Sequence, residues 1–131
     1  MILIDELLAI ATARLEDVDV LLKQDRLDGA EYLCGYAVEL ALKARICRTL
    51  NWAGFPETKS EFQDFASFKT HKLVVLLSLS GQEERIKRDH LSEWSVVEKW
   101  DAEARYRRVG HADFGQVVLM WSYAGNLVKV L

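Results

Sequence analysis

The chain has 131 residues, of which 50% are hydrophobic and 28% are charged, and this composition excludes an intrinsically disordered segment. Its formal net charge of -3 excludes a general electrostatic attraction for nucleic acid, so any phosphate binding requires a local basic patch. No apolar run reaches the roughly 18 residues of a membrane span, and the acidic opening MILIDE is unlike a secretion signal. We expect a single domain over residues 1–131, located in the cytoplasm and away from membranes.

The first predicted elements are two long helices, because only one proline and seven glycines interrupt the chain. Apolar residues recur with a helical period over residues 3–22. After a short polar turn, Asp28 is placed to cap a second helix that runs to about Leu50. Residues 51–68 have no sustained period and predict a long loop, with one helical turn near residues 61–65.

Two shorter helices are predicted after this loop. Thr70 is placed to cap a helix over residues 72–79, and Gly81 is placed to end it. A further helix is predicted over residues 82–99, where apolar residues again recur with a helical period. Within the loop, we expect the aromatic rings of Trp52 and Phe55 either to contact a partner or to cover the end of the helical bundle.

The last predicted element is a helix that begins at Phe114, capped by Asp113 after a break at Gly110. No strand-like alternation persists anywhere in the chain. The sequence therefore predicts an all-α fold of about five helices in a mainly antiparallel, up-and-down bundle.

The two cysteines, Cys34 and Cys47, both fall within the second predicted helix, several turns apart. They cannot bridge each other at that separation, and no Cys/His spacing typical of a metal site occurs. We expect two reduced and packed thiols, no bound metal and no cofactor.

The second predicted helix carries a narrow polar stripe of Tyr32, Tyr36, Glu39 and Lys43 beside the arc assigned to the core. Glu39 and Lys43 form an i,i+4 pair, which contributes only a few tenths of a kcal/mol when exposed. One interpretation is an ordinary amphipathic boundary. The other is a ligand groove or a subunit contact, where tyrosine is enriched.

A locally basic stretch, WDAEARYRRVGHADF, covers residues 100–114 of this acidic chain. Arginine binds phosphate through two parallel hydrogen bonds, and histidine transfers protons near neutral pH. The stretch therefore predicts a helix end that binds phosphate or an acidic partner. The alternative is a solvated helix end in which Arg105 pairs with a carboxylate such as Glu39. The basic side chains of the stretch are Arg105, Arg107, Arg108 and His111.

Three short segments together resemble the signature segments of HEPN domains: GYAVELALKA at 35–44, THKL at 70–73 and WDAEARY at 100–106. Their order and spacing agree with that family, and the resemblance spans nearly the whole chain. It implies a bundle of about five helices that often dimerises through helices near the site. It also implies a place in toxin–antitoxin or phage-defence systems, with a minimal nucleotidyltransferase as a frequent partner.

The resemblance also raises the question of RNA cleavage without a metal. Members of the family that cleave RNA carry an arginine followed, after four to six residues, by a histidine. Arg105 and His111 are separated by five residues, which fits this spacing. In such a pair the guanidinium stabilises the charge on the phosphoryl oxygens while the histidine moves a proton. Tyr106 departs from the polar residue that follows the arginine in cleaving members, and it points to another branch of the family.

Three functional hypotheses therefore compete. The first is a HEPN-type module, dimeric, that binds a nucleotide, RNA or a partner nucleotidyltransferase in a groove on the second helix. The second is a metal-independent endoribonuclease toxin that uses Arg105 and His111, and the third is a purely structural protein-interaction domain. We expect His71 to fix the entry of the loop by hydrogen bonding, with a role in the site as the alternative. The predicted groove residues are Tyr32, Tyr36, Glu39, Lys43, Arg105, Tyr106, Arg107 and Arg108.

Overall fold

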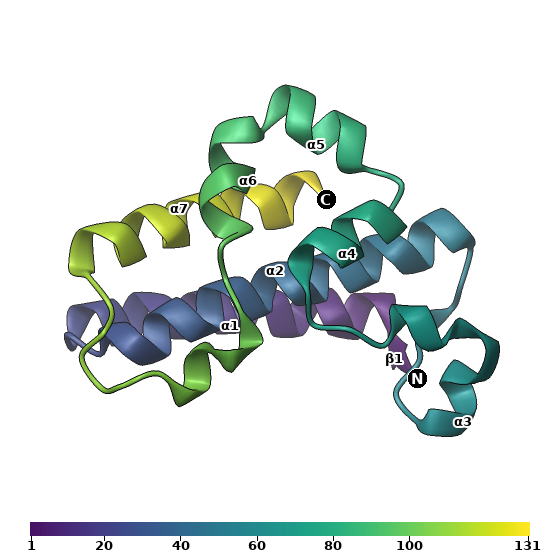
Figure 1. The fold of residues 1–131 in the computed structure, drawn as a ribbon, viewed down its shortest axis with the longest axis horizontal. Coiled ribbons are helices and arrows are strands. Elements are labelled where there is room, and N and C mark those ends of the chain that lie inside the picture. The colour runs from purple at the N-terminus through teal and green to yellow at the C-terminus, as the bar shows by residue number, and fades with distance from the viewer.

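A computed structural model describes all residues from 1 to 131. The chain is predominantly helical, with seven α-helices, two 3-10 helices and one antiparallel pair of two-residue strands, so the all-α fold class is confirmed (Figure 1). The helices are α1 (Ile4–Lys23), α2 (Leu27–Leu50), α3 (Lys59–Phe62), α4 (Leu73–Leu79), α5 (Glu83–Asp89), α6 (Leu91–Val97) and α7 (Phe114–Val130). The 3-10 helices are η1 (Gln63–Phe68) and η2 (Ala102–Tyr106), and the strands are β1 (Ile2–Leu3) and β2 (Gly54–Phe55).

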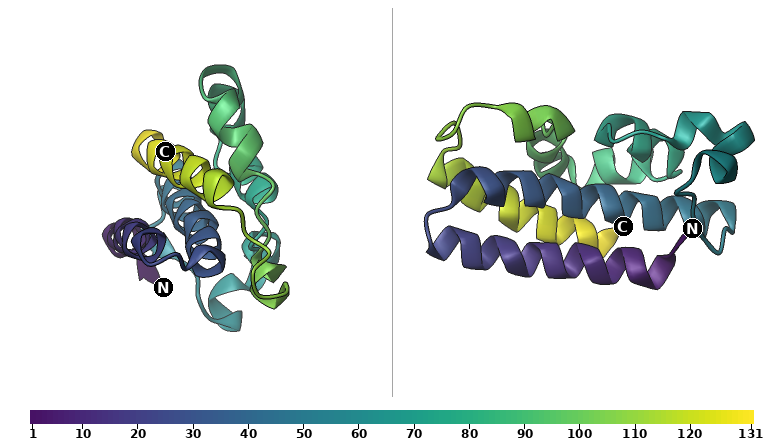
Figure 2. Two further views of the ribbon diagram at one scale, coloured as in Figure 1. Left: turned by 90° about the vertical axis from the view of Figure 1, so that its left-hand side faces the viewer. Right: turned by 90° about the horizontal axis from the view of Figure 1, so that it is seen from below.

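The three longest helices pack together along the molecule. α1 and α2 lie side by side and antiparallel, and α7 packs against both (Figures 1 and 2). α4 and η2 contact α2 on the side away from α1 (Figure 2). None of the helices combines the length and the apolar character that a transmembrane segment requires.

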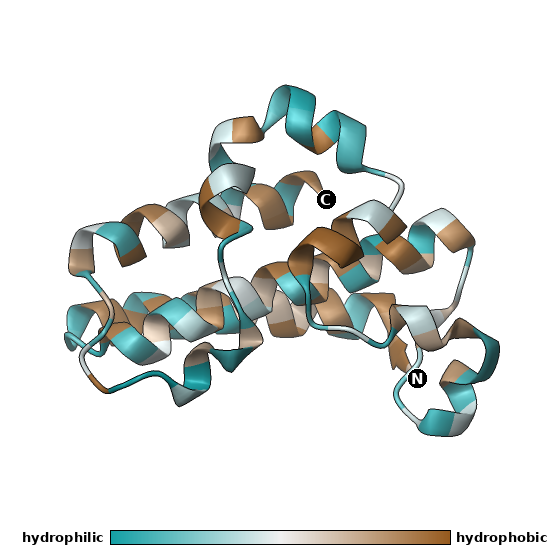
Figure 3. Cartoon of the chain, viewed as in Figure 1, coloured by the Kyte–Doolittle hydropathy of each residue, from teal (hydrophilic) through white to brown (hydrophobic).

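The central element is α2, which is buried around most of its circumference because helices contact it on several sides. Its small residues, including both cysteines, allow these neighbours to approach closely. Burial raises the pKa of the Cys34 thiol to about 12 and that of Cys47 to about 11, so both thiols are protonated and unreactive at neutral pH. Hydrophobic residues gather on α4 and α7, whereas α5 is largely hydrophilic (Figure 3).

One predicted helix is divided in the structure. Instead of a continuous helix over residues 82–99, α5 ends at Asp89 and α6 begins at Leu91, because His90 has a non-helical φ of -135°. Ile86 and Trp94 are both fully buried, although eight residues on a straight helix would place them about 80° apart. The break reorients α6 so that it packs against α7, and it raises the helix count above the predicted five.

The predicted loop over residues 51–68 contains more structure than expected. β2 pairs antiparallel with β1 at the start of the chain, and Thr58 caps α3 by accepting a hydrogen bond from the Glu61 amide. A two-residue strand has no periodicity, so no sequence pattern predicted the pairing of β1 with β2. Trp52 and Phe55 pack in an aromatic cluster with ring centroids 6.4 Å apart, and Phe55 is only 2% exposed.

Candidate ligand-binding site

The three segments that carry the family resemblance meet on one face of α2. A Cβ atom added to Gly35 would lie between 2.0 and 2.2 Å from the ring atoms of Trp100, so the indole rests directly on the α2 backbone. The Trp100 Nε1 donates a hydrogen bond to the carbonyl of Tyr32 at 3.1 Å. The His71 Nδ1 lies 3.0 Å from the Glu39 carboxylate, which ties the second segment to the first. The structure therefore brings α2 and the arginine-bearing segment side by side.

Arg105 lies in η2, and not at the end of the long helix that the sequence predicted. Asp101 begins η2 by accepting a hydrogen bond from the Glu103 amide at 2.9 Å, after the chain has left α6. The anchored ring of Trp100 fixes this short helix against α2. A tertiary contact, and not helix continuation, therefore positions Arg105.

A buried ion cluster lies at the centre of the site. The Glu39 side chain is only 2% exposed, its Oε2 lies 3.1 Å from the Lys43 ammonium, and Lys43 is 15% exposed. The His71 side chain, which contacts the other carboxylate oxygen of Glu39, is 67% exposed. The Lys43 ammonium also lies 5.2 Å from the centroid of the Phe55 ring. The Glu39–Lys43 pair is therefore not exposed. His71 does form a hydrogen bond, but its partner is Glu39 on α2.

Two tyrosines continue this surface along α2. The rings of Tyr32 and Tyr36 are nearly parallel, at 10°, with their centroids 6.3 Å apart. Burial raises the pKa of the Tyr36 phenol, and the nearby carboxylate of Glu39 adds to this effect. The positive charge of Arg14 on α1 opposes this shift. The phenol of Tyr36 is therefore a neutral hydrogen-bond donor at physiological pH.

Arg105 and Tyr106 form the outer edge of the same surface. The Arg105 guanidinium lies 4.8 Å from the centroid of the Tyr106 ring, and Tyr106 is largely exposed. The phenol oxygens of Tyr106 and Tyr32 raise the pKa of the Arg105 guanidinium above its ordinary value. The alternative pairing of Arg105 with Glu39 is wrong, because Glu39 is already held by Lys43 and His71.

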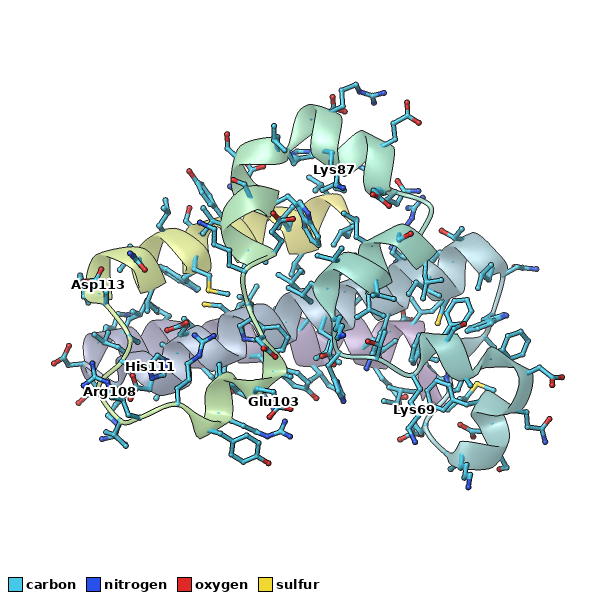
Figure 4. All side chains as sticks on the ribbon, viewed as in Figure 1. Lys69, Lys87, Glu103, Arg108, His111 and Asp113 are labelled. Atoms are coloured by element: carbon cyan, nitrogen blue, oxygen red, sulfur yellow. The ribbon has the colours of Figure 1, made fainter.

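Two hollows adjoin the ion cluster, and Tyr32, Arg105 and Tyr106 line neither of them. The smaller, of about 270 Å³, is enclosed by α2, the start of the chain, residues 55–57 and 62, and the segment before α4. The larger, of about 740 Å³, lies between the start of α4 and residues 98–103. Thr70 and His71 border both, and Figure 4 shows Lys69 and Glu103 on the same face of the molecule. The polar side chains that line the smaller hollow include Tyr36, Glu39, Lys43, Lys69, Thr70 and His71.

His111 lies apart from this surface, against the start of α2 (Figure 4). Its Nδ1 donates to the Arg108 carbonyl at 2.9 Å and lies 3.4 Å from the Asp28 carboxylate. Its Nε2 is buried and lies 3.4 Å from the Glu31 carboxylate, close enough for attraction but without hydrogen-bond geometry. No hydrogen bond or ion pair joins His111 to Arg105. These contacts fit a histidine that holds the loop after η2 on α2.

The remaining two arginines of the basic stretch belong to this loop. The Arg107 guanidinium lies 3.8 Å from the Glu31 carboxylate, and the Arg108 side chain is exposed to solvent. Of the predicted groove residues, the structure thus joins those on α2 with Arg105 and Tyr106. It places Arg107 and Arg108 at the start of α2, beyond the two tyrosines.

Asp28 does not cap α2 as predicted, because Arg26 occupies the N-cap position. The Asp28 carboxylate instead accepts hydrogen bonds from the amides of Gly110, at 2.7 Å, and Ala112, at 3.0 Å. Gly110 has a φ of +86°, a conformation that glycine adopts without strain. These bonds lower the pKa of Asp28, and its carboxylate fastens the loop to α2.

We expect the substitution Asp28→Asn to lower the free energy of unfolding at about pH 7. Asparagine is neutral, so its side chain accepts weaker hydrogen bonds from the two amides. The pKa of Asp28 is lowered in the folded state, so its contribution is complete above the ordinary carboxyl pKa and is lost as the pH falls through the folded pKa. The difference between wild type and Asp28→Asn should therefore shrink as the pH falls below the ordinary carboxyl range. Urea unfolding at several pH values measures this difference in the free energy of unfolding, and Asp64→Asn at an exposed position is the control. A difference that does not change with pH would contradict this account.

Comparisons with protein-family models, with curated proteins and with solved structures give no match for this chain. The structure contains no cluster of histidine, cysteine and carboxylate side chains arranged to hold a metal ion. The site consists of a buried carboxylate, cationic side chains and aromatic rings.

Sequence reasoning missed one cationic residue that lines this site, Lys69. Lys69 directly precedes the THKL segment, so its position next to that segment was an available signal.

Proposed function

We propose that this chain is a HEPN-type helical module that binds the phosphate group of a nucleotide or RNA on the exposed face of α2. We further propose that it acts as a dimer in a toxin–antitoxin or phage-defence system, with a minimal nucleotidyltransferase as its protein partner. The three segments that resemble the HEPN signatures support this proposal, because they lie far apart in the sequence and contact one another on α2.

The burial of the Glu39 carboxylate is the observation on which the ligand-binding proposal depends. Burying a carboxylate and an ammonium together costs desolvation free energy, and replacing both by apolar residues is often neutral or stabilising. A fold therefore has little need for Glu39, Lys43 and His71 in the wall of an open hollow. Titratable groups gathered in a concave surface are instead typical of binding sites.

The arrangement suggests how a nucleotide would be held. Arg105 is exposed beside Tyr106, where its planar guanidinium can bind two phosphate oxygens. Tyr106 offers an exposed ring on which a base can stack, a contact worth about 1–3 kcal/mol per base in other proteins. Glu39 holds the Lys43 ammonium at the edge of the smaller hollow, where it would meet a second anionic group.

We expect Arg105→Ala to weaken binding of adenosine monophosphate, or of a single-stranded RNA of about 12 nucleotides, by about tenfold or more. The reason is the loss of a charge-assisted hydrogen bond to phosphate. Binding is measured by fluorescence anisotropy for labelled RNA and by calorimetry for the nucleotide. The control is Lys87→Ala, because Lys87 is paired with Glu83 on α5 and lies across the molecule from Glu103 (Figure 4). No binding of either probe by the wild type, or equal binding by both variants, would contradict the proposal.

The same RNA, incubated with a chelator, tests the ribonuclease alternative. Cleavage that persists in chelator and disappears in His111→Ala would assign a catalytic role to Arg105 and His111. Binding without cleavage supports the module proposed above. If neither probe binds and the dimer persists, a purely structural interaction domain remains.

A further inference from the structure

The chain between α6 and α7 forms an arch. Residues 98–113 leave the end of α6, cross the face of α2 and return to the start of α7 (Figure 1). Trp100 fixes one end of the arch on α2, and the Asp28 carboxylate fixes the other through the amides of Gly110 and Ala112. A hollow of about 380 Å³ opens between this arch and the helices α2, α6 and α7.

The floor of this hollow is apolar. Trp100, Val117 and Met120 are each at most 8% exposed, and the half-buried Val96 and the exposed Leu119 extend the wall. The volume of about 380 Å³ lies in the lower part of the range of small-molecule pockets, about 300–1,000 Å³. An indole ring and a methionine sulfur both form favourable contacts with aromatic rings. The floor therefore suits a ligand of one or two fused rings.

The charged side chains of the hollow are mainly cationic. Lys99 is exposed and forms no ion pair within the chain. Arg107 is 49% exposed, and its only carboxylate partner is Glu31 at 3.8 Å, which is longer than a hydrogen bond. The Glu31 carboxylate also lies 3.4 Å from the Nε2 of His111. The hollow therefore has two cations and one carboxylate, and that carboxylate is already shared between two groups.

We infer that this hollow binds a small aromatic anion, a molecule of one or two fused rings that carries a carboxylate or phosphate group. The rings lie against Trp100 and Met120, where their removal from water supplies most of the binding free energy. The anionic group meets Lys99 and Arg107 at the exposed rim, where charge-assisted hydrogen bonds hold it. The same two side chains repel a cationic ligand.

This inference does not depend on the proposed function. Lys43, Arg105 and Tyr106 do not line this hollow, so a failure of Arg105→Ala to weaken nucleotide binding would leave the inference standing. Two kinds of molecule share the chemistry of an aromatic ring with an anionic group. One is a small aromatic carboxylic acid, and the other is a nucleotide. The experiment therefore uses one probe of each kind.

The test uses the two methionines of the chain, Met1 and Met120, as reporters. When their methyl groups are isotope-labelled, the ring current of an aromatic ligand in the hollow shifts the Met120 signal, and Met1 outside the hollow is the internal control. The probes are naphthalene carboxylate, its neutral carboxamide and adenosine monophosphate, each titrated to about 1 mM. We expect the carboxylate or the nucleotide to shift Met120, and the tighter of the two identifies the kind of ligand. The carboxamide should bind at least about fivefold more weakly than the carboxylate.

Two kinds of variant locate the bound probe. Arg107→Met should weaken binding of the anionic probe by about threefold to tenfold, because it removes a charge-assisted hydrogen bond at an exposed position. The matched control is Arg108→Met, since Arg108 is the next residue, is also exposed and does not line the hollow. Leu119→Trp, at another exposed position, should fill the hollow and abolish the Met120 shift, while circular dichroism checks that the helices remain folded.

Three results would overturn the inference. The first is a Met120 signal that neither the carboxylate nor the nucleotide moves. The second is a carboxamide that binds as tightly as the carboxylate, because the rim would then not select an anion. The third is equal binding by Arg107→Met and Arg108→Met, or an unchanged Met120 shift in a folded Leu119→Trp, because the probe would then lie elsewhere.

Discussion

Gly35→Ala is expected to destabilise the protein by about 1–3 kcal/mol, although alanine is normally the better residue inside a helix. The added Cβ would fall 2.0 Å from the Trp100 ring, a separation that no packed atoms can occupy, so the indole must move. Since Trp100 fixes η2 on α2, its displacement also moves Arg105. We therefore expect weaker binding of nucleotide or RNA as well as a lower free energy of unfolding. Urea unfolding followed by tryptophan fluorescence measures the change in the free energy of unfolding.

The matched control is Gly29→Ala, six residues earlier on the same helix. A Cβ atom at Gly29 meets only a Leu21 methyl at 3.6 Å, an ordinary van der Waals distance. This substitution should leave the free energy of unfolding unchanged or raise it by up to about 1 kcal/mol. If both substitutions had the same effect, the close contact between Gly35 and Trp100 would not exist in solution.

Glu39→Leu is expected to lower the free energy of unfolding by about 2–3 kcal/mol, because it leaves the Lys43 ammonium without its counter-charge. This is less than the 3–5 kcal/mol typical of fully enclosed pairs, since Lys43 is 15% exposed. Adding Lys43→Met should restore the stability to within about 1 kcal/mol of the wild type. The double variant should nevertheless fail to bind nucleotide or RNA.

This pair of variants separates a functional cluster from a structural one. Recovery of stability without recovery of binding supports the assignment of Glu39 and Lys43 to a ligand site. If the double variant binds the probes as well as the wild type does, the cluster is not part of the site. If its stability stays low, the ion pair contributes to the fold itself.

The long elements were predictable because their apolar residues repeat over many turns. α1, α2 and α7 lie where the sequence placed them, and Asp113 caps α7 as predicted, accepting from the Gln116 amide at 3.0 Å. Local departures from the predicted helices and caps could not be read from the sequence. The break at His90 accompanies the burial of both Ile86 and Trp94. Asp28 is diverted from capping by amides that lie more than 80 residues later in the chain.

The sequence predicted which residues belong to the candidate site better than it predicted their burial and contacts. Periodicity placed Glu39 and Lys43 on one stripe, and the resemblance connected that stripe to Arg105. The burial of Glu39 depends on β2 and on the segment before α4, whose positions no local pattern specifies. The separation of His111 from Arg105 depends likewise on the anchoring of the intervening loop to Asp28.

The most direct test of the account is an amide chemical-shift titration of the isotope-labelled chain with single-stranded RNA or adenosine monophosphate. We predict that signals from the α2 stripe around Lys43, from His71 and from Arg105 shift together with one dissociation constant, because these residues form one surface. Signals from α5 should not follow them. Shifts confined to one of the three segments, or no shift with either probe, would contradict the central claim that the segments build a single phosphate-binding site.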